Sequence, residues 1–399
     1  GDGGPERVSN RTGCGFRFQG RPMSIFLAWH NTFENKKRTF AAIGGICFSL
    51  LLVFMQLGFL VTARTTAGLA YNYFDYDLII TSARYETMMN AGSFDKTRLV
   101  QARVVRGVRD VSNLNYEVAR WRDPYSKFGH GSSCMLFGFD LNPDFIPDKS
   151  VVPKLRELFS HGSVLLDIHS HEDYGEKRIG KRVSLNFVDV TIAELFELGI
   201  SFHSEGAVLT GLDTFSAISK RDSRKATFGL IKVVPGMDPM NVLEELRRTL
   251  PSDVLVFERK AFIKAEQDYF TSVKPIGIMF QAGTFVAFAV GSVILFQVLS
   301  TEISNRLKEF ATLKAIGFSN SYIYKVGAQQ SVLFATLSFV PALPLGHLVA
   351  FLVQKASRLP MYLTWDLALF TYFLSLIMCV ISGALALWKV RRADPAELF

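Results

Sequence analysis

AAIGGICFSLLLVFMQLGFLVT (residues 41–62) decides the fold, because this stretch contains no Asp, Glu, Lys, Arg or His. Three further apolar stretches lie near the end of the chain, at 275–299, 325–354 and 367–388. A bilayer core of about 30 Å is crossed by about 20 apolar residues in a helix, and each stretch reaches that length. The sequence therefore predicts an integral membrane protein with four transmembrane helices, one before and three after a long polar region.

Basic residues flank the predicted spans mostly on one side of the membrane. They precede the first span, lie between the second and third, and follow the fourth: Lys36, Lys37, Arg38, Arg306, Lys308, Lys314, Lys325, Lys389, Arg391 and Arg392. The positive-inside rule places these segments in the cytoplasm, although Lys355 and Arg358 on the other side make the asymmetry a bias. Both termini are then cytoplasmic and 63–274 lies outside. The net charge of +8 follows from this distribution, so nucleic-acid binding is not predicted.

Hydropathy and charge divide the chain into consecutive segments. They are a disordered N-terminal tail (1–22), an amphipathic pre-membrane helix (23–40), transmembrane helix 1 (41–62), an exported, periplasmic α/β domain (63–274), transmembrane helix 2 (275–299), a cytoplasmic hairpin (300–324), transmembrane helix 3 (325–354), a short outer loop (355–366), transmembrane helix 4 (367–388) and a cytoplasmic tail (389–399). The pre-membrane helix presents Ile25, Phe26, Trp29 and Phe33 on one face, which suits the headgroup layer. An ordinary extension of the first span is the alternative.

The exported domain alternates signals for strands and helices. The strand candidates are 74–82, 110–121 and 133–141, and the helix candidates are 95–105 and 259–273. The clearest unit is a β-α-β sequence with a strand at 228–234, a helix at 238–250 and a strand at 253–258. Asp238 is the candidate N-cap of this helix and Pro239 its first residue. The sequence therefore predicts a large mixed α/β domain between helices 1 and 2.

Helical periodicity continues on both sides of span 2. In the hairpin 300–324 apolar residues recur at helical spacing until Gly317, where the pattern stops. From 259 through span 2 to Phe310 the periodicity predicts nearly one helix of about fifty residues, roughly 75 Å long. Pro341 and Pro344 predict a kink or a break in span 3.

Small residues form a stripe in span 2, where Gly283, Ala287 and Gly291 recur every four residues. Small side chains let helix backbones approach closely in lipid, so the stripe predicts a helix-packing contact, either within the chain or with a partner subunit. The interiors of the spans lack ionisable residues apart from His347, which we interpret as structural. Proton- or ion-coupled transport usually needs such groups, so it is not predicted.

Two weak motifs lie in the exported domain. GEKRIGKR (175–182) is one position short of a phosphate-binding loop, because Arg182 stands where Ser or Thr would hold Mg²⁺. HSHED (169–173) has a spacing that would put both histidines on one face of a strand, where imidazoles can bind zinc; a solvated loop is the favoured alternative. Cys134 is the single cysteine of the domain, which excludes an internal disulfide there. No catalytic, cofactor-binding or metal-binding residues are predicted.

The chain resembles the FtsX-like and MacB-like ABC transporter permeases, and most closely the DevC-type permeases. The matching stretches are FMQLGF (54–59), GLIKVVPGMDP (229–239), PIGIMF (275–280), EFATLKAIGFS (309–319), MCVISGALAL (378–387) and ADPAELF (393–399). The resemblance runs from about Met23 to Phe399, apart from the middle of the exported domain at about 125–225. Its most specific parts are EFATLKAIGFS and ADPAELF.

The resemblance implies a homodimeric inner-membrane permease that passes motion across the membrane rather than binding nucleotide. ATP would be bound by a separate cytoplasmic ABC ATPase. The periplasmic domain would have two lobes and would contact a membrane-fusion adaptor and, in some systems, an outer-membrane duct. By position, the hairpin 300–324 would be the coupling element that docks on the ATPase, through Glu302, Arg306, Glu309, Phe310, Lys314, Gly317 and Phe318.

Three functions remain open at this point. The first is a permease that exports lipid, glycolipid or another envelope cargo. The second is an FtsX-like regulator that switches a periplasmic hydrolase without transport. The third is a membrane-anchored enzyme, for which only the residues at 169–173 offer candidate ligands.

Overall fold

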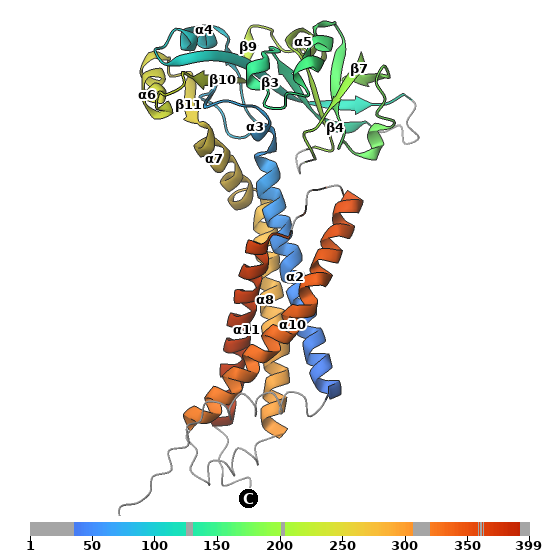
Figure 1. Ribbon diagram of the computed structural model, residues 1–399, viewed down its shortest axis with the longest axis vertical. Coiled ribbons are helices and arrows are strands. Elements are labelled where there is room, and N and C mark those ends of the chain that lie inside the picture. Colours follow the sequence, from blue (N-terminus) through green and yellow to red (C-terminus); the bar gives the residue numbers. More distant parts are fainter. Residues whose placement is uncertain are drawn as a thin grey trace, which may run out of the picture. The chain divides into compact units, whose positions relative to one another are not determined.

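The computed structural model describes residues 36–124, 131–200, 204–305, 320–357, 359, 361 and 363–391. Within this part of the chain four helices are long and apolar enough to cross a membrane. They are α2 (Lys36–Ala67), α8 (Pro275–Asn305), α10 (Asn320–Ser357) and α11 (Trp365–Arg391), drawn in blue, light orange, orange and red in Figure 1. A large domain of strands and helices lies in the sequence between α2 and α8. The predicted fold class, with one span, a mixed α/β domain and three further spans, is confirmed.

Contacts within the chain divide it into two compact units. One comprises Gly1–Leu51, Ala287–Leu343 and Leu369–Phe399, and the other comprises Leu52–Val286 and Pro344–Ala368. The described residues of the first unit all belong to the four long helices. The second unit contains the whole extramembrane domain together with the helix ends that connect to it.

The extramembrane domain is built on a nine-stranded sheet of order β11-β1-β10-β3-β4-β8-β5-β7-β6. Its strands are β1 (Leu78–Ser82), β3 (Val108–Arg122), β4 (Ser132–Phe139), β5 (Ser163–Asp167), β6 (Arg182–Leu185), β7 (Val188–Phe196), β8 (Ala207–Gly211), β10 (Phe228–Val233) and β11 (Val254–Glu258), while β2 (Phe94–Asp95) and β9 (Lys225–Ala226) form a separate pair. The pairs β4–β8 and β5–β7 are parallel. The three strands predicted at 74–82, 110–121 and 133–141 are confirmed, with shifted ends.

One lobe of the domain consists of β11, β1, β10 and the first half of β3, covered by two helices. The helices α4 (Thr97–Arg103) and α6 (Pro239–Thr249) share a buried cluster with these strands. Asp238 caps α6 as predicted, since its carboxylate accepts a hydrogen bond of 3.0 Å from the Met240 N–H, and Pro239 is the first helical residue. The strands on either side of α6 are not neighbours, because β1 pairs with both of them.

The second lobe is a closed barrel. Trp121 of β3 pairs with Ser132 of β4 on one side and with Leu185 of β6 on the other. The order β3, β4, β8, β5, β7, β6 therefore closes on itself through the pairing of β6 with β3. Trp121 and buried aliphatic residues of these strands fill the interior of the barrel. The connecting elements are α5 (Leu212–Ser219) and the short helices η1 (Pro143–Phe145), η2 (Val152–Phe159) and η3 (Glu172–Tyr174). The two lobes share the long strand β3, whose halves pair with different strands.

The face of the sheet opposite α4 and α6 carries the elements that lead to the membrane helices. These elements are α3 (Leu69–Tyr73), which follows α2, and α7 (Arg259–Ser272), which precedes α8. Tyr71 and Phe262 pack edge to face, with ring centroids 5.0 Å apart, in a core that also contains Phe228 of β10. Both chain connections to the membrane helices are thus anchored in one aromatic core.

The structure corrects the predictions of an unbroken helix through span 2 and of a break in span 3. The helix predicted to run unbroken from 259 through span 2 is divided, because α7 ends at Ser272 and α8 begins at Pro275. Proline lacks an N–H donor and disfavours helical geometry at the residue before it, here Lys274. Conversely, no break interrupts span 3, since α10 continues through Pro341 and Pro344. Proline is tolerated in a membrane helix where neighbouring groups satisfy the freed carbonyls.

Candidate functional site

The small-residue stripe of α8 lies against other helices of the same chain. A side chain at Gly283 would meet Gln56 at 2.5 Å, and one at Gly291 would meet Ser49 at 2.2 Å. Between them, the carbonyl of Ala287 accepts a hydrogen bond of 2.7 Å from the Ser49 hydroxyl. The stripe thus lets α2 approach α8 closely. A contact of the same residues with a second copy of the chain stays a prediction.

The predicted coupling residues fall at the edge of the described chain. Glu302 belongs to the last part of α8, which ends at Asn305. Arg306, Glu309, Phe310, Lys314, Gly317 and Phe318 lie outside the described residues. So do the apolar positions predicted for the pre-membrane helix at 25–33. Their assignment therefore rests on sequence.

The junction between α7 and α8 is held by a close backbone approach. A Cβ atom at Gly277 would lie 2.1 Å from the Thr271 carbonyl oxygen, so glycine is required at this crossing. Gln281 Nε2 donates a hydrogen bond of 3.0 Å to the same carbonyl, which the end of α7 leaves without a helical partner. The junction is thus a specific turn in which Gly277 and Gln281 of α8 contact the end of α7.

A second contact joins the two helices that connect the domain to the membrane spans. Arg64 of α2 forms a 2.9 Å ion pair with Asp268 of α7, and both side chains are about half exposed. Lys274 lies over the ring of Tyr269, 5.6 Å from its centroid. Cationic and aromatic groups at the ends of spans are typical of the membrane–water interface. The ion pair thus links α2 to α7, while the junction links α7 to α8.

Sequence analysis missed a buried carboxylate in α7. Glu266 is 4% exposed and accepts hydrogen bonds from the Tyr85 hydroxyl at 2.5 Å and from the Met88 N–H at 3.1 Å. Burial raises the pKa of Glu266 above its ordinary value. The sequence indicates its position, because Phe262, Ile263 and Phe270 form the buried stripe of α7 and Glu266 lies within this stripe. A carboxylate in an apolar stripe is the signal that could have found it.

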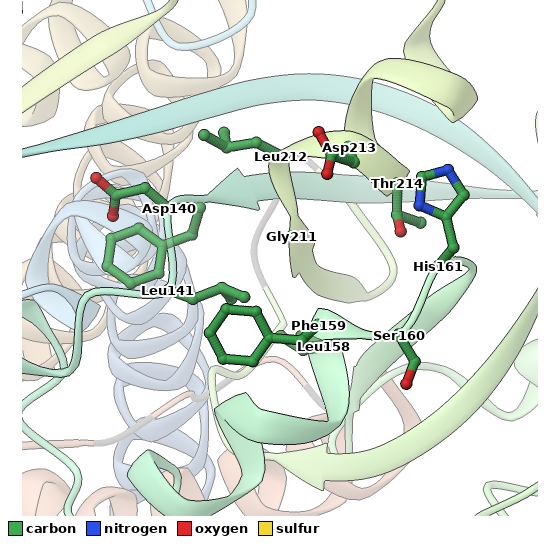
Figure 2. Close-up of a pocket in the computed structure, with 11 residues that line it drawn as sticks. Asp140, Leu141, Leu158, Phe159, Ser160, His161, Gly211, Leu212, Asp213 and Thr214 are labelled. Carbon is green, nitrogen blue, oxygen red and sulfur yellow. The ribbon is translucent and has the colours of Figure 1, made fainter.

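A surface pocket of about 240 Å³ opens in the barrel lobe (Figure 2). It is lined by the end of η2, the start of α5 and the turn after β4, through Phe139, Asp140, Leu141, Leu158, Phe159, Ser160, His161, Gly211, Leu212, Asp213 and Thr214. No hydrogen bond within the described chain links Ser160, His161 and Asp213, so they do not form a proton relay of the hydrolase type. The pocket thus offers no assembled catalytic set.

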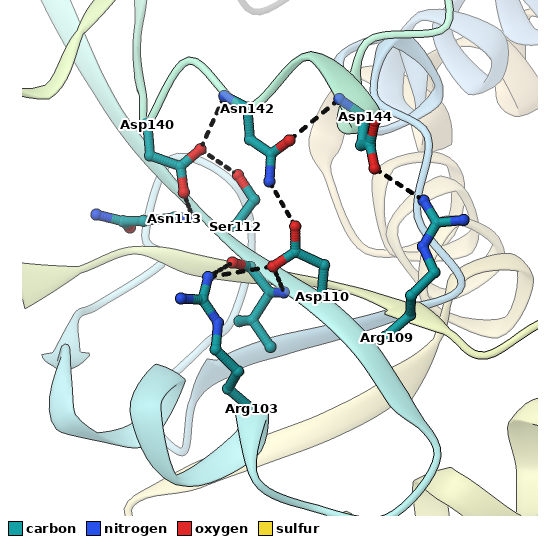
Figure 3. A network of polar contacts seen from close by, with 9 residues as sticks. Arg103, Arg109, Asp110, Ser112, Asn113, Asp140, Asn142 and Asp144 are labelled. Carbon is teal, nitrogen blue, oxygen red and sulfur yellow. Dashed lines mark hydrogen bonds and ion pairs between the residues drawn. The ribbon is translucent and has the colours of Figure 1, made fainter.

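Beside this pocket lies a polar network in which carboxylates accept hydrogen bonds or form ion pairs within the domain (Figure 3). The Ser112 hydroxyl and the Asn113 N–H donate to Asp140, Arg103 and the Asn142 amide bind Asp110, and Arg109 pairs with Asp144. These contacts tie the turn after β4 to β3. Each acid already has a partner, which gives the network a structural role.

The two weak motifs are turns in the structure. In HSHED the favoured loop is confirmed and the alternative of a strand is not, since β5 ends at Asp167 and η3 begins at Glu172. In GEKRIGKR, Lys177 donates to the carbonyls of Ile168 and Ser170, and Lys181 forms a 2.5 Å ion pair with the buried Asp123. The lysines thus hold this loop to the barrel.

An exposed aromatic residue marks the tip of the β6–β7 hairpin. Asn186 and Phe187 form its two-residue loop with φ of 48° and 68°, and Phe187 is 87% exposed. Positive φ at both loop residues matches the twist of a hairpin, but the second position usually holds glycine. Arg120 and Arg122 lie next to this tip on exposed positions of β3, because Arg120 pairs with Asn186 and Arg122 with Ser184.

Comparisons with known proteins bear on the C-terminal third of the chain. The family model described as FtsX-like permease C-terminal matches residues 282–395, a range that contains most of α8 and all of α10 and α11. No curated protein sequence matches the chain.

Three solved structures resemble the chain weakly. The extracellular domain of the noncanonic ABC-type transporter YknZ from Gram-positive bacteria is 11% identical, with 46% of this chain and 100% of that chain covered and a TM-score of 0.34. The periplasmic region of MacB from Actinobacillus actinomycetemcomitans is 11% identical, with 47% and 90% covered and a TM-score of 0.34. A domain of a permease protein from Porphyromonas gingivalis is 14% identical, with 46% and 88% covered and a TM-score of 0.31.

The class of this chain is indicated by the family match at 282–395 and by the four apolar helices. The DevC subtype stays a prediction. The chain is a multi-pass membrane protein whose residues 282–395 match the family model described as FtsX-like permease C-terminal.

Proposed function

We propose that this chain is the permease subunit of an ABC-type export complex, in which a separate cytoplasmic ATPase drives motion of the extramembrane domain. The observation that carries the proposal is the FtsX-like domain at 282–395, joined to an α/β domain that lies between spans 1 and 2. In this arrangement both connections of the domain are helices, α2–α3 and α7–α8. A displacement of the spans therefore reaches the domain through helical segments at each connection.

The energy source is proposed to be another chain. In the loop 175–182, which is the segment most similar to a phosphate-binding motif, Lys177 and Lys181 make contacts within the barrel lobe. A phosphate-binding lysine must instead point at the nucleotide. ATP is accordingly assigned to the partner ATPase, which docks on the hairpin 300–324 through the coupling residues predicted above.

The extramembrane domain is proposed to act by binding partners. Its exposed Phe187, with Arg120 and Arg122 close by, has the composition of a protein contact, where aromatic and arginine side chains are enriched. This supports the periplasmic membrane-fusion adaptor as a partner. The homodimer, the outer-membrane duct, the inner-membrane location with cytoplasmic termini, and a lipid or glycolipid cargo belong to the same proposal.

Co-purification of the full-length chain in detergent tests this function. We expect an ABC ATPase and an adaptor to co-purify with it, and ATP hydrolysis to rise when the adaptor is present. An ATPase found together with a hydrolase and without an adaptor would replace export by regulation. Recovery of the chain with no ATPase would refute both functions.

A backbone break in α8 tests the mechanical part. Leu299 is 2% exposed in α8, and Leu299→Pro interrupts the helix there, whereas Leu299→Ala removes the side chain and keeps the helix. We expect Leu299→Pro to abolish adaptor-stimulated ATP hydrolysis and Leu299→Ala to retain most of it. Equal stimulation in both variants would contradict transmission through α8.

A further inference from the structure

The carboxylate of Glu266 is buried without a cation beside it. No Lys, Arg or His of the described chain forms an ion pair with it, and Lys274 acts on it only at longer range. Burying a charge is costly unless hydrogen bonds compensate, and here the compensation comes from Tyr85 and Met88. Both donors belong to the turn that follows β1, so a charge on α7 is satisfied entirely by a neighbouring segment.

The hydrogen bonds form a directed chain that includes both connections to the membrane helices. The Tyr85 hydroxyl donates to Glu266, so it accepts from the Tyr71 hydroxyl, 2.8 Å away. Tyr71 lies in α3, which follows span 1, and Glu266 lies in α7, which precedes span 2. Tyr85 therefore bridges the two connections.

The turn that carries Tyr85 and Met88 is tied to the sheet by its own hydrogen bonds. The Ala83 N–H donates to the Asp253 carbonyl at 2.9 Å, and the Tyr85 N–H donates to the Ser82 carbonyl at 3.0 Å. At the tip, the Asn90 N–H donates to the Thr87 carbonyl, also at 3.0 Å. The first two bonds hold the base of the turn to β1 and to the residue before β11, and the third closes the turn internally, so the turn follows β1.

Aromatic packing fixes the same groups in place. The ring of Phe262, one turn before Glu266 in α7, lies 5.0 Å from the ring of Tyr71 and 5.2 Å from that of Tyr85. Tyr71 is 1% and Phe262 3% exposed, so the contact between these two rings is closed to water. Side chains locked by packing and hydrogen bonds hold a defined geometry under load.

We propose that Glu266, Tyr85 and Tyr71 form a joint that ties the segments after span 1 and before span 2 to β1, so that displacement of α7 reaches the sheet. The inference rests on the proposed function, because it names the residues through which motion of the spans enters the domain. Glu266 is a positioning residue here: it acts on β1 through the turn after that strand.

Hydrogen–deuterium exchange of the full-length chain with its co-purified ATPase, in nanodiscs, tests the joint. The variants are Glu266→Ala, the isosteric Glu266→Gln, and Glu245→Gln as a control that makes the same chemical change at an exposed site of α6. Without nucleotide, we expect the Met88 amide to exchange about tenfold faster in Glu266→Ala, because its acceptor is lost, and at the wild-type rate in the control.

The decisive readout is the change in amide exchange rate when a non-hydrolysable ATP analogue is added. In the wild type and the control, exchange should change in α7 and in 83–91 together. In Glu266→Ala the change in α7 should persist while that in 83–91 is lost, and Glu266→Gln should restore it in part. A merely structural role would not separate the two segments.

Two results would overturn the joint, and they are distinguishable. If 83–91 still responds to the nucleotide as strongly in both Glu266 variants as in the wild type, the joint is refuted and the proposed function stands. If the wild type shows no nucleotide response in α7 or α8, the proposed function fails and the joint fails with it.

Discussion

Two residues of this protein, Glu266 and Phe187, are unfavourable for folding stability at the positions they occupy. Glu266 occupies a position in the buried stripe of α7 where an apolar side chain would be expected, and Phe187 occupies a loop position where glycine would be expected. A carboxylate in a core loses hydration, and a non-glycine residue at positive φ is strained by about 1–2 kcal/mol. Both residues are visible in the sequence as exceptions to a pattern, but their partners are visible only in the fold.

The raised pKa of Glu266 makes the stability of the domain depend on pH. The folded state holds the proton of Glu266 more tightly than the unfolded chain, whose ordinary value is 4.5. The stabilisation is therefore complete below pH 4.5 and is lost as the pH rises through the raised value. We expect the thermal midpoint of Glu266→Gln to fall less than that of the wild type across this window. Parallel curves for the two proteins, measured in detergent from pH 4.5 to neutral, would contradict it.

Replacing Phe187 by glycine is expected to stabilise the protein. Glycine adopts the φ of 68° without strain, and it completes the Asn-Gly pair that a two-residue hairpin favours. Phe187→Ala serves as the control, since it removes the same exposed ring and keeps the strain. The glycine variant should exceed the alanine variant by about 1 kcal/mol in unfolding free energy. The reverse order in thermal unfolding would show that the turn is not strained.

At the scale of elements, local signals located the four spans, the helices α4, α6 and α7 and five strands of the sheet, but not the strands β5 to β8 or the pairing partners. The cap Asp238 and the residue Pro239 fixed the start of α6, and apolar length fixed the four spans. By contrast, the closure of the barrel depends on two residue pairs between β3 and β6, which lie some sixty residues apart in the chain. No periodicity specifies such a pairing, because register between distant strands is set by packing of the whole core. The same holds for the division of β3 between two lobes.

The α7–α8 junction is expected to fail when Gly277 acquires a side chain. A Cβ atom there would lie 2.1 Å from the backbone carbonyl of Thr271, and a backbone atom cannot be moved without separating the two helices. Gly44→Ala in α2 is the matched control, since its Cβ would meet nothing within 4 Å. We expect Gly277→Ala to lower the thermal midpoint by several degrees and Gly44→Ala to leave it unchanged or raise it. A lower midpoint for the control alone would refute the assigned crossing.

At the scale of the whole molecule, the function depends on which compartment each segment faces. Composition predicts four spans, and the single span α8 between the extramembrane domain and the hairpin 300–324 places these two segments on opposite sides. The charge bias predicts their orientation with Lys355 and Arg358 as exceptions, because this orientation would put both residues on the outer side. The assignment of ATPase docking to one face and partner binding to the other follows from this topology and would fail with it.

Three engineered cysteines test the topology in intact cells, in a background without Cys14, Cys47, Cys134 and Cys379. Ser150→Cys lies in the extramembrane domain, Ser304→Cys near the end of α8, and Thr364→Cys in the connection between α10 and α11; all three positions are exposed. A membrane-impermeant maleimide should label positions 150 and 364 directly and position 304 only after permeabilisation. Labelling of 150 and 304 alone would mean that α8 does not cross the membrane, and no ATPase could then act on the hairpin from the opposite side. Labelling of 304 alone would invert the molecule and place its partner-binding domain in the cytoplasm, which would remove the adaptor from the proposed function.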